Sequence, residues 1–161
     1  MILGMSTSAF TLLHVIISLI GIVAGLIALL GLLGGKLYRG LTALFLVTTV
    51  LTSVTGFFFP FHGATPGIIL GVLSLIVLAP AFWALYVGKL AGGWRGTYVI
   101  TSSLALYFNF FVLVAQSFAK IPALKAIAPT QASPGFGITQ LVVLLIFIWL
   151  TVRAFRRFGS A

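Results

Sequence analysis

The chain has 161 residues, of which 61% are hydrophobic and 6% are charged. A soluble domain is about one quarter charged, so this composition excludes a water-soluble globule and predicts an integral membrane protein. The nine charged residues are all Lys or Arg, and the chain has no Asp, Glu or Cys. Paired-carboxylate and Ser-His-Asp catalytic sites, carboxylate-gated proton pumps and cysteine-based metal or redox centres are therefore excluded.

The basic residues divide the chain into long neutral runs. A helix needs about 20 apolar residues to cross a bilayer, and the second run is too long for one crossing. It is broken at Pro60–Gly67, a turn segment with a proline near each end. We therefore predict an all-α fold, a polytopic transmembrane helical bundle that forms a single domain over residues 1–161. Its five spans are expected at residues 9–33, 41–60, 67–88, 97–118 and 137–155.

The first and second spans carry small and hydroxyl side chains at helical spacing. Gly21 and Gly25 form a small-xxx-small pair in the first span, and Thr48, Thr52 and Thr55 form a stripe in the second. Such residues ordinarily serve close packing between membrane helices, with the Thr hydroxyls bonded to carbonyls of their own helix. A hydroxyl-lined path for a small polar solute is the alternative.

A short sequence recurs where the first and third spans end. Gly35-Lys36-Leu37 follows the first span and Gly88-Lys89-Leu90 follows the third, and each is followed by an Arg-Gly pair at the next span. This predicts two duplicated helical hairpins and one added helix, a kind of repeat that recurs in membrane transport folds. Chance convergence is the alternative, because Gly and basic residues are common in such turns.

Basic residues gather on alternate connections and after the last span. Five spans place seven of the nine on one side, which the positive-inside rule makes cytoplasmic, with the N-terminus outside. Arg153, Arg156 and Arg157 are expected to anchor the last helix at anionic lipids, each contributing about 1 kcal/mol. The other four are Lys36, Arg39, Lys89 and Arg95, and the opposite side carries Lys120 and Lys125.

Polar side chains collect at the outer ends of the spans. His14 begins the first span, His62 lies in an outer turn, and Asn109 and Gln116 share a face of the fourth span, with Lys120 just beyond it. Unpaired polar groups are expensive in lipid, so the two amides are expected to face the interior. These five residues are our candidate ligand-binding set. Interhelical or headgroup hydrogen bonding alone is the alternative role for each.

No arrangement of nucleophile, base and orienting group is present, so we expect no enzymatic activity. The leading hypothesis is an outward-facing pocket between the first and fourth spans that binds a lipophilic or anionic ligand such as a lipid, a quinone or a small anion. The net charge of +9 favours negative partners, anionic membrane lipids above all. The alternative is a structural or accessory subunit of a homo-oligomer or a larger membrane complex. Nucleic acid is not an expected partner.

Two further hypotheses stay open at this point. A b-type haem could use His14 and His62 as axial ligands, although a turn holds a ligand less firmly than two facing helices do. Such a protein would be red, with a Soret band lost in His14→Ala. A passive pore would select anions, because the chain has no acidic residue to form a cation-selective ring.

The run Tyr107–Phe118, continued by Pro122–Leu124 and Ala128–Gln131, resembles a set of small bacterial polytopic inner-membrane proteins of unknown function. The similarity is clearest over residues 107–134, with a looser match at 10–34. The resemblance implies a bacterial inner-membrane location and no particular activity. The residues that it highlights are Asn109, Gln116, Pro122 and Gln131.

Overall fold

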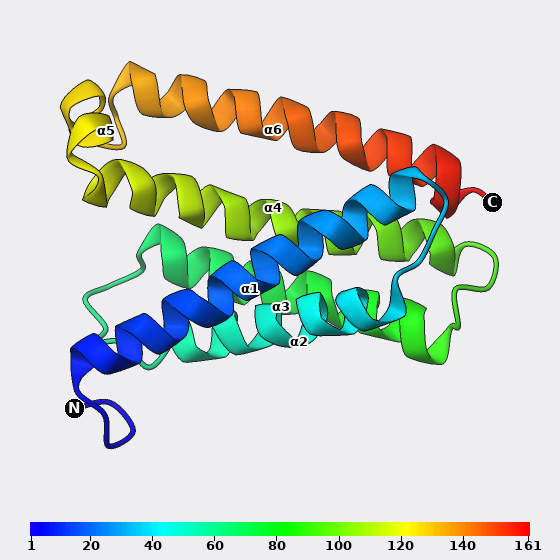
Figure 1. The fold of residues 1–161 in the computed structure, drawn as a ribbon, viewed down its shortest axis with the longest axis horizontal. Coiled ribbons are helices and arrows are strands. Elements are labelled where there is room, and N and C mark those ends of the chain that lie inside the picture. Colours follow the sequence, from blue (N-terminus) through cyan, green and yellow to red (C-terminus); the bar gives the residue numbers. More distant parts are fainter.

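The computed structural model describes all 161 residues as a bundle of helices with no strand (Figure 1). Five helices are long and apolar enough to cross a membrane, which confirms the predicted all-α, five-span architecture of a multi-pass membrane protein. Short π-helical turns, η1 (Trp83–Val87) and η2 (Phe155–Gly159), extend the third and fifth of them, and a sixth helix, α5 (Pro122–Ile127), is short. The five long helices are α1 (Thr7–Leu33), α2 (Arg39–Gly56), α3 (Pro66–Phe82), α4 (Trp94–Lys120) and α6 (Pro134–Ala154).

Several helix boundaries differ from the predicted ones by a few residues. Helices α1, α3 and α6 begin earlier than expected, because polar capping residues and Pro lie just outside the apolar runs. Ser6 accepts a hydrogen bond from the Ala9 amide, and Thr65 accepts one from the Ile68 amide. Helix α2 ends four residues early, at Gly56, where the Phe57 amide donates to the Val54 carbonyl in a tighter turn.

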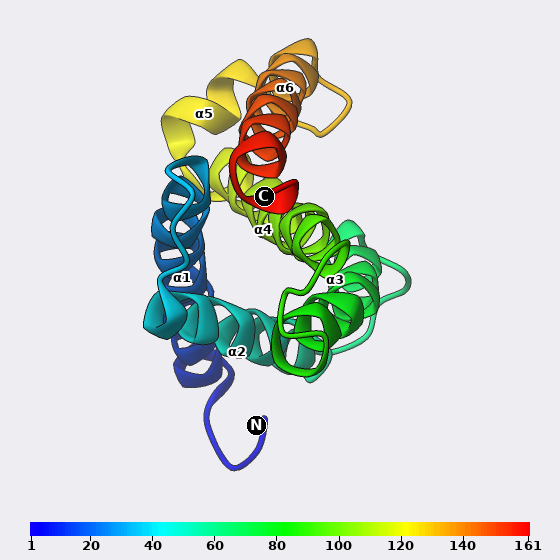
Figure 2. The ribbon, with the colours of Figure 1, turned by 90° about the vertical axis from the view of Figure 1, so that its right-hand side faces the viewer.

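Consecutive long helices lie side by side and form a ring when the bundle is viewed along its length (Figure 2). Helix α1 crosses the others obliquely and also contacts α4 and α6 (Figure 1). We call the end that carries the α1–α2 and α3–α4 connections and the C-terminus the basic end. The other end, with the N-terminus and α5, is the N-terminal end (Figure 1).

Close approach of α1 to its neighbours depends on glycine. A Cβ atom added at Gly25 would lie 2.7 Å from side-chain atoms of both Phe45 and Leu106. One added at Gly21 would lie 2.8 Å from the Thr48 hydroxyl. The predicted small-xxx-small packing is confirmed, and α1, α2 and α4 meet here around a continuous apolar core.

The threonine stripe of α2 serves packing, as predicted. The hydroxyls of Thr48, Thr52 and Thr55 donate to the carbonyls four residues earlier, at 2.6, 2.8 and 2.7 Å. These bonds satisfy the hydroxyls within the helix, so that the side chains lie in an apolar interface at little cost.

The two Gly-Lys-Leu segments lie at the same end of the bundle but differ in backbone geometry. After α1, Gly35 adopts a φ of +72° and the Lys36 amide donates to the Gly31 carbonyl. After η1, Lys89 and Leu90 themselves adopt positive φ, and the Leu90 amide donates to the Ala84 carbonyl. The two hairpins therefore share their direction, while their turns are built differently.

Candidate functional site

His14 connects α1 to α2 at the N-terminal end. Its Nδ1 lies 2.7 Å from the Thr55 hydroxyl, and its ring packs edge-on against Phe59, with 5.3 Å between centroids. The side chain is half-buried. Because the Thr55 hydroxyl already donates to the Leu51 carbonyl, it is placed to accept a hydrogen bond from the imidazole. His14 is thus part of the α1–α2 interface.

Asn109 faces the interior, as predicted. It is 9% exposed, and its Nδ2 donates to the Thr49 hydroxyl at 3.2 Å, which connects α4 to α2. The prediction for Gln116 is wrong, because this side chain is exposed. At this level α4 packs through Phe118 against Phe136. Side chains two positions apart on a helix point about 200° away from each other. Gln116 therefore lies on the side of α4 opposite to Phe118.

Lys120 and His62 are both exposed at the N-terminal end. The structure thus places His14 and Asn109 in separate interhelical contacts. Gln116, Lys120 and His62 all lie on the surface. None of the five predicted residues lines the surface groove between α1 and α2 or the small cavity where α1, α2 and α4 meet.

Gln140 is a polar residue near the start of α6 that lies outside the predicted binding set. It is 7% exposed, and its Nε2 donates to the Phe111 carbonyl of α4 at 3.0 Å. Its Oε1 is buried without a partner in the chain. This bond connects the start of α6 to the backbone of α4.

Arg95 holds the C-terminal turn at the basic end. Its Nε donates to the Phe158 carbonyl at 2.8 Å, and its guanidinium lies 4.1 Å from the centre of the Phe158 ring. Gly96 permits the close packing of η2 against α4, because a Cβ atom at Gly96 would lie 2.6 Å from the Phe155 ring. A cation bonded to the last carbonyls of a helix also interacts favourably with its dipole. The sequence showed Arg95 only as one of the basic residues that set the orientation.

The three arginines at the end of the chain are exposed, as their predicted lipid contact requires. Arg153 lies 5.8 Å from the Trp149 ring, so this pair presents an aromatic surface and a positive charge together. No acidic side chain exists to pair with any of them.

An apolar groove of about 350 Å³ lies on the surface between α1 and α2. All seven side chains that line it are hydrophobic, five from α1 and two from α2. Ala24, 3% exposed, lies at its floor, while Val23 and Ile27 are 57% and 40% exposed. On α2 the groove reaches Leu41, two residues after Arg39. Lys36, in the α1–α2 connection, and Arg39, the first residue of α2, are both exposed at this end.

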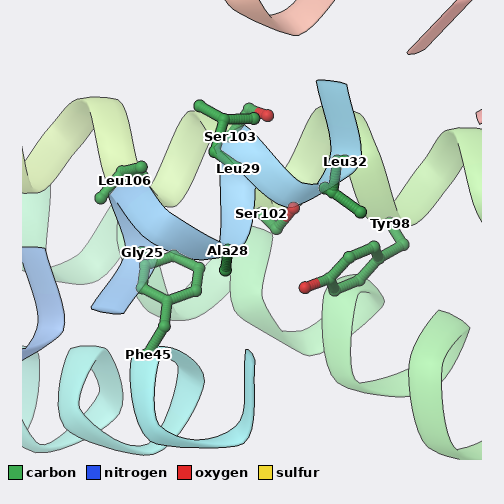
Figure 3. Close-up of a pocket in the computed structure, with 9 residues that line it drawn as sticks. All are labelled: Gly25, Ala28, Leu29, Leu32, Phe45, Tyr98, Ser102, Ser103 and Leu106. Atoms are coloured by element: carbon green, nitrogen blue, oxygen red, sulfur yellow. The ribbon is translucent and has the colours of Figure 1, made fainter. Parts of the chain in front are cut away.

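A second hollow lies inside the bundle, where α1, α2 and α4 meet (Figure 3). It is small, with about 10 Å³ open to the centre of a water molecule. Gly25, Ala28 and other residues of α1 form one wall, and Tyr98, Ser102 and Ser103 of α4 supply hydroxyl groups.

The fold defines a multi-pass membrane protein built from five long apolar helices. No family model, curated protein or solved structure matches the chain. The structure contains no group of three or more His, Cys, Asp or Glu side chains that could hold a metal ion.

Proposed function

We propose that this chain is a non-enzymatic protein of the bacterial inner membrane that binds an anionic phospholipid along the α1–α2 groove. The observation that carries the proposal is a wholly apolar groove that reaches Leu41, with two exposed basic side chains, Lys36 and Arg39, at the same end of the bundle. In this proposal the groove holds an acyl chain, and Lys36 and Arg39 bind the lipid phosphate. A drug-sized ligand site has a volume of roughly 300–1,000 Å³, and the groove falls in that range.

Charge complementarity favours an anionic lipid over a neutral one. The chain has no Asp or Glu, so Lys36 and Arg39 have no side-chain counterion within the protein. Each basic side chain near an anionic membrane surface contributes about 1 kcal/mol. This site lies at the basic end, whereas the pocket expected from the sequence lay at the opposite end.

The proposed orientation places the basic end in the cytoplasm and the N-terminus outside, following the positive-inside rule. The groove then lies in the inner leaflet, with Lys36 and Arg39 at the level of its phosphates. Reporter fusions at the two chain ends test this orientation. Activity of a cytoplasmic reporter at both ends, or of a periplasmic reporter at both ends, would contradict it.

Lipid retention measures the groove directly. Purified protein in nanodiscs of mixed phosphatidylglycerol and phosphatidylcholine is transferred to detergent, and native mass spectrometry counts the bound lipids. We expect the Lys36→Ala/Arg39→Ala double variant to lose the preference for phosphatidylglycerol by about 30-fold, as two basic side chains at about 1 kcal/mol each imply. Val23→Phe, which fills the groove, is expected to lower retention of both lipids.

Two matched variants control for general effects. Lys89→Ala removes an exposed charge from the same end without touching the groove, and it is compared with Lys36→Ala. Leu145→Phe enlarges a side chain of α6 that is 56% exposed. If these variants lose as much lipid as the groove variants do, the proposal is wrong. Loss of a dimer in Val23→Phe, with no lipid lost, would instead assign the groove to a second copy of the chain.

The second candidate function is a structural or accessory subunit of a homo-oligomeric or larger complex. It is favoured by α6, whose apolar surface is largely uncovered: only 17% of its membrane-spanning window is buried. Trp149 and Ile138 on this helix are 57% and 63% exposed. Native mass spectrometry from the same nanodiscs distinguishes the two, because a subunit of a homo-oligomer would give one multiple of the chain mass.

A further inference from the structure

The exposed Trp and Tyr side chains gather at one end of the bundle. The chain has three Trp residues, and all are exposed, at 54%, 39% and 57% for Trp83, Trp94 and Trp149. Trp83 begins η1, Trp94 begins α4 and Trp149 lies near the end of α6, so all three are at the basic end (Figure 1). The exposed tyrosines, Tyr38 and Tyr86, lie at the start of α2 and in η1. We call these five residues the aromatic girdle.

The exposed aromatic residues of the N-terminal end are of a different kind. Phe57 and Phe58, which follow α2, and Phe61, in the α2–α3 connection, are 41%, 47% and 72% exposed. The other two tyrosines of the chain, Tyr98 and Tyr107, are not exposed. A phenylalanine ring has no polar atom, whereas Trp carries an N–H donor and Tyr an O–H group. Exposed indole and phenol groups are thus confined to the basic end.

Indole and phenol groups suit the boundary between hydrocarbon and lipid headgroups. Such a ring places its apolar body in the hydrocarbon and its N–H or O–H among the headgroups, which is why Trp and Tyr are enriched at membrane interfaces. At the centre of a bilayer the polar atom would lack a partner. Arg153 lies 5.8 Å from the Trp149 ring, so a cation that can pair with a lipid phosphate lies beside a girdle residue. The other exposed basic residues of this end are Lys36, Arg39, Lys89, Arg156 and Arg157.

The aromatic girdle is distributed around the bundle and does not form a single patch. Its members belong to the start of α2, to η1, to α4 and to α6, and these helices lie round the bundle when it is viewed along its length (Figure 2). Trp94 packs closely on the α3–α4 connection, because a Cβ atom added at Gly88 would lie 2.6 Å from its ring. A single protein partner would cover one side of the bundle, whereas a membrane meets it on all sides. The distribution therefore favours lipid as the partner of the girdle.

We propose that the aromatic girdle lies in the headgroup region of one leaflet and sets the depth at which the bundle sits in the membrane. The ester and phosphate oxygens of the lipids accept hydrogen bonds from its indole and phenol groups, and the neighbouring Lys and Arg side chains pair with the phosphates. None of the five girdle residues lines the α1–α2 groove, so this proposal is independent of the lipid proposed to bind there. It also holds whichever compartment the basic end faces.

The fluorescence of the unaltered protein tests this depth, because every Trp of the chain belongs to the girdle. The protein is reconstituted in vesicles of phosphatidylcholine and phosphatidylglycerol. Part of the phosphatidylcholine carries bromine, which quenches nearby indoles, either close to the headgroup or close to the methyl end of its acyl chain. We expect the shallow bromine to reduce the emission more than the deep bromine does. Variants with a single Trp, in which the other two are replaced by Phe, assign the depth of each ring.

A control variant places an indole in the middle of a span. Leu141→Trp, at a side chain of α6 that is 55% exposed, in a chain with the three native Trp residues replaced by Phe, should be quenched more by the deep bromine. The same result for the unaltered protein would overturn the proposal. Quenching of the unaltered protein by acrylamide in the water, with no effect of either lipid, would place the girdle outside the membrane and would also overturn it. Protection from all three quenchers would mean that another protein chain covers the girdle, which contradicts the proposal as well.

Discussion

Helices α1 and α6 are similar in length and apolar character, but they are packed very differently. In the membrane-spanning window of α1, 44% of the residues are buried in the protein, against 17% for α6. Both helices lie beside α4, but only α1 crosses the bundle and contacts α2, α4 and α6 (Figure 2). The apolar surface that α6 leaves uncovered is available to lipid or to another chain.

Small residues explain the difference. Helix α1 carries Gly21, Gly25 and Ala28 on the face that meets its neighbours, and the glycines allow side-chain contact at their Cα atoms. The middle of α6, Leu141–Leu150, has only large apolar side chains, and these hold neighbouring backbones apart. Lipid tails are as apolar as these side chains, so apolarity alone does not draw two helices together in a membrane. Close van der Waals contact along small residues is what holds two such helices together.

The largest effect is expected for the one strongly buried position in the middle of α6. Phe147 is 5% exposed and packs against Tyr107 and Phe110, at 5.7 and 5.1 Å between ring centroids. Phe147→Ala should lower the free energy of unfolding by about 3 kcal/mol, because it leaves a cavity. Leu145→Ala, at a side chain 56% exposed, should change it by less than about 0.5 kcal/mol. Denaturation in mixed micelles measures both, and equal losses would contradict the contrast within this helix.

Glycine-to-alanine substitutions should change the free energy of unfolding in opposite directions in the two helices. Gly25→Ala brings a methyl group within 2.7 Å of Phe45 and Leu106 and should destabilise the protein by about 1–3 kcal/mol. At Gly137 of α6 a Cβ atom meets nothing within 4 Å, so Gly137→Ala should stabilise the helix by up to about 1 kcal/mol. The same unfolding experiment compares them. A loss of stability in both variants would mean that α6 is packed as closely as α1.

The smallest effect concerns the C-terminal end of α6, which Arg95 holds from α4. Arg95→Ala removes the hydrogen bond to the Phe158 carbonyl and the contact with its ring, and should cost about 1 kcal/mol. Hydrogen exchange of the amides at 155–160 should become faster, while the middle of α6 is unchanged. Arg156→Ala, an exposed neighbour, is the control. Equal exchange in the two variants would show that Arg95 does not hold this turn.

The sequence predicted some polar positions correctly and others not. Asn109 was expected to face the interior and does, because an amide near the middle of a span must find a partner. Gln116 lies near the end of α4, where an exposed polar side chain costs less free energy than in the middle of a span. Helical periodicity predicted that it shares the interior face of Asn109, and this was wrong. Helix α5 was missed, because six residues are too few to show a helical period.

Composition and charge by themselves determined that this protein crosses a membrane, how many times, and roughly where each span lies. These properties depend on the transfer of whole segments from water to lipid, which is a sum over residues and can be read along the chain. The choice of neighbours, the groove between α1 and α2, the hydroxyl-lined cavity and the bond from Arg95 to Phe158 were decided only by the tertiary structure. Each depends on contacts between residues far apart in the sequence, and in lipid these contacts arise from the matching of helix surfaces.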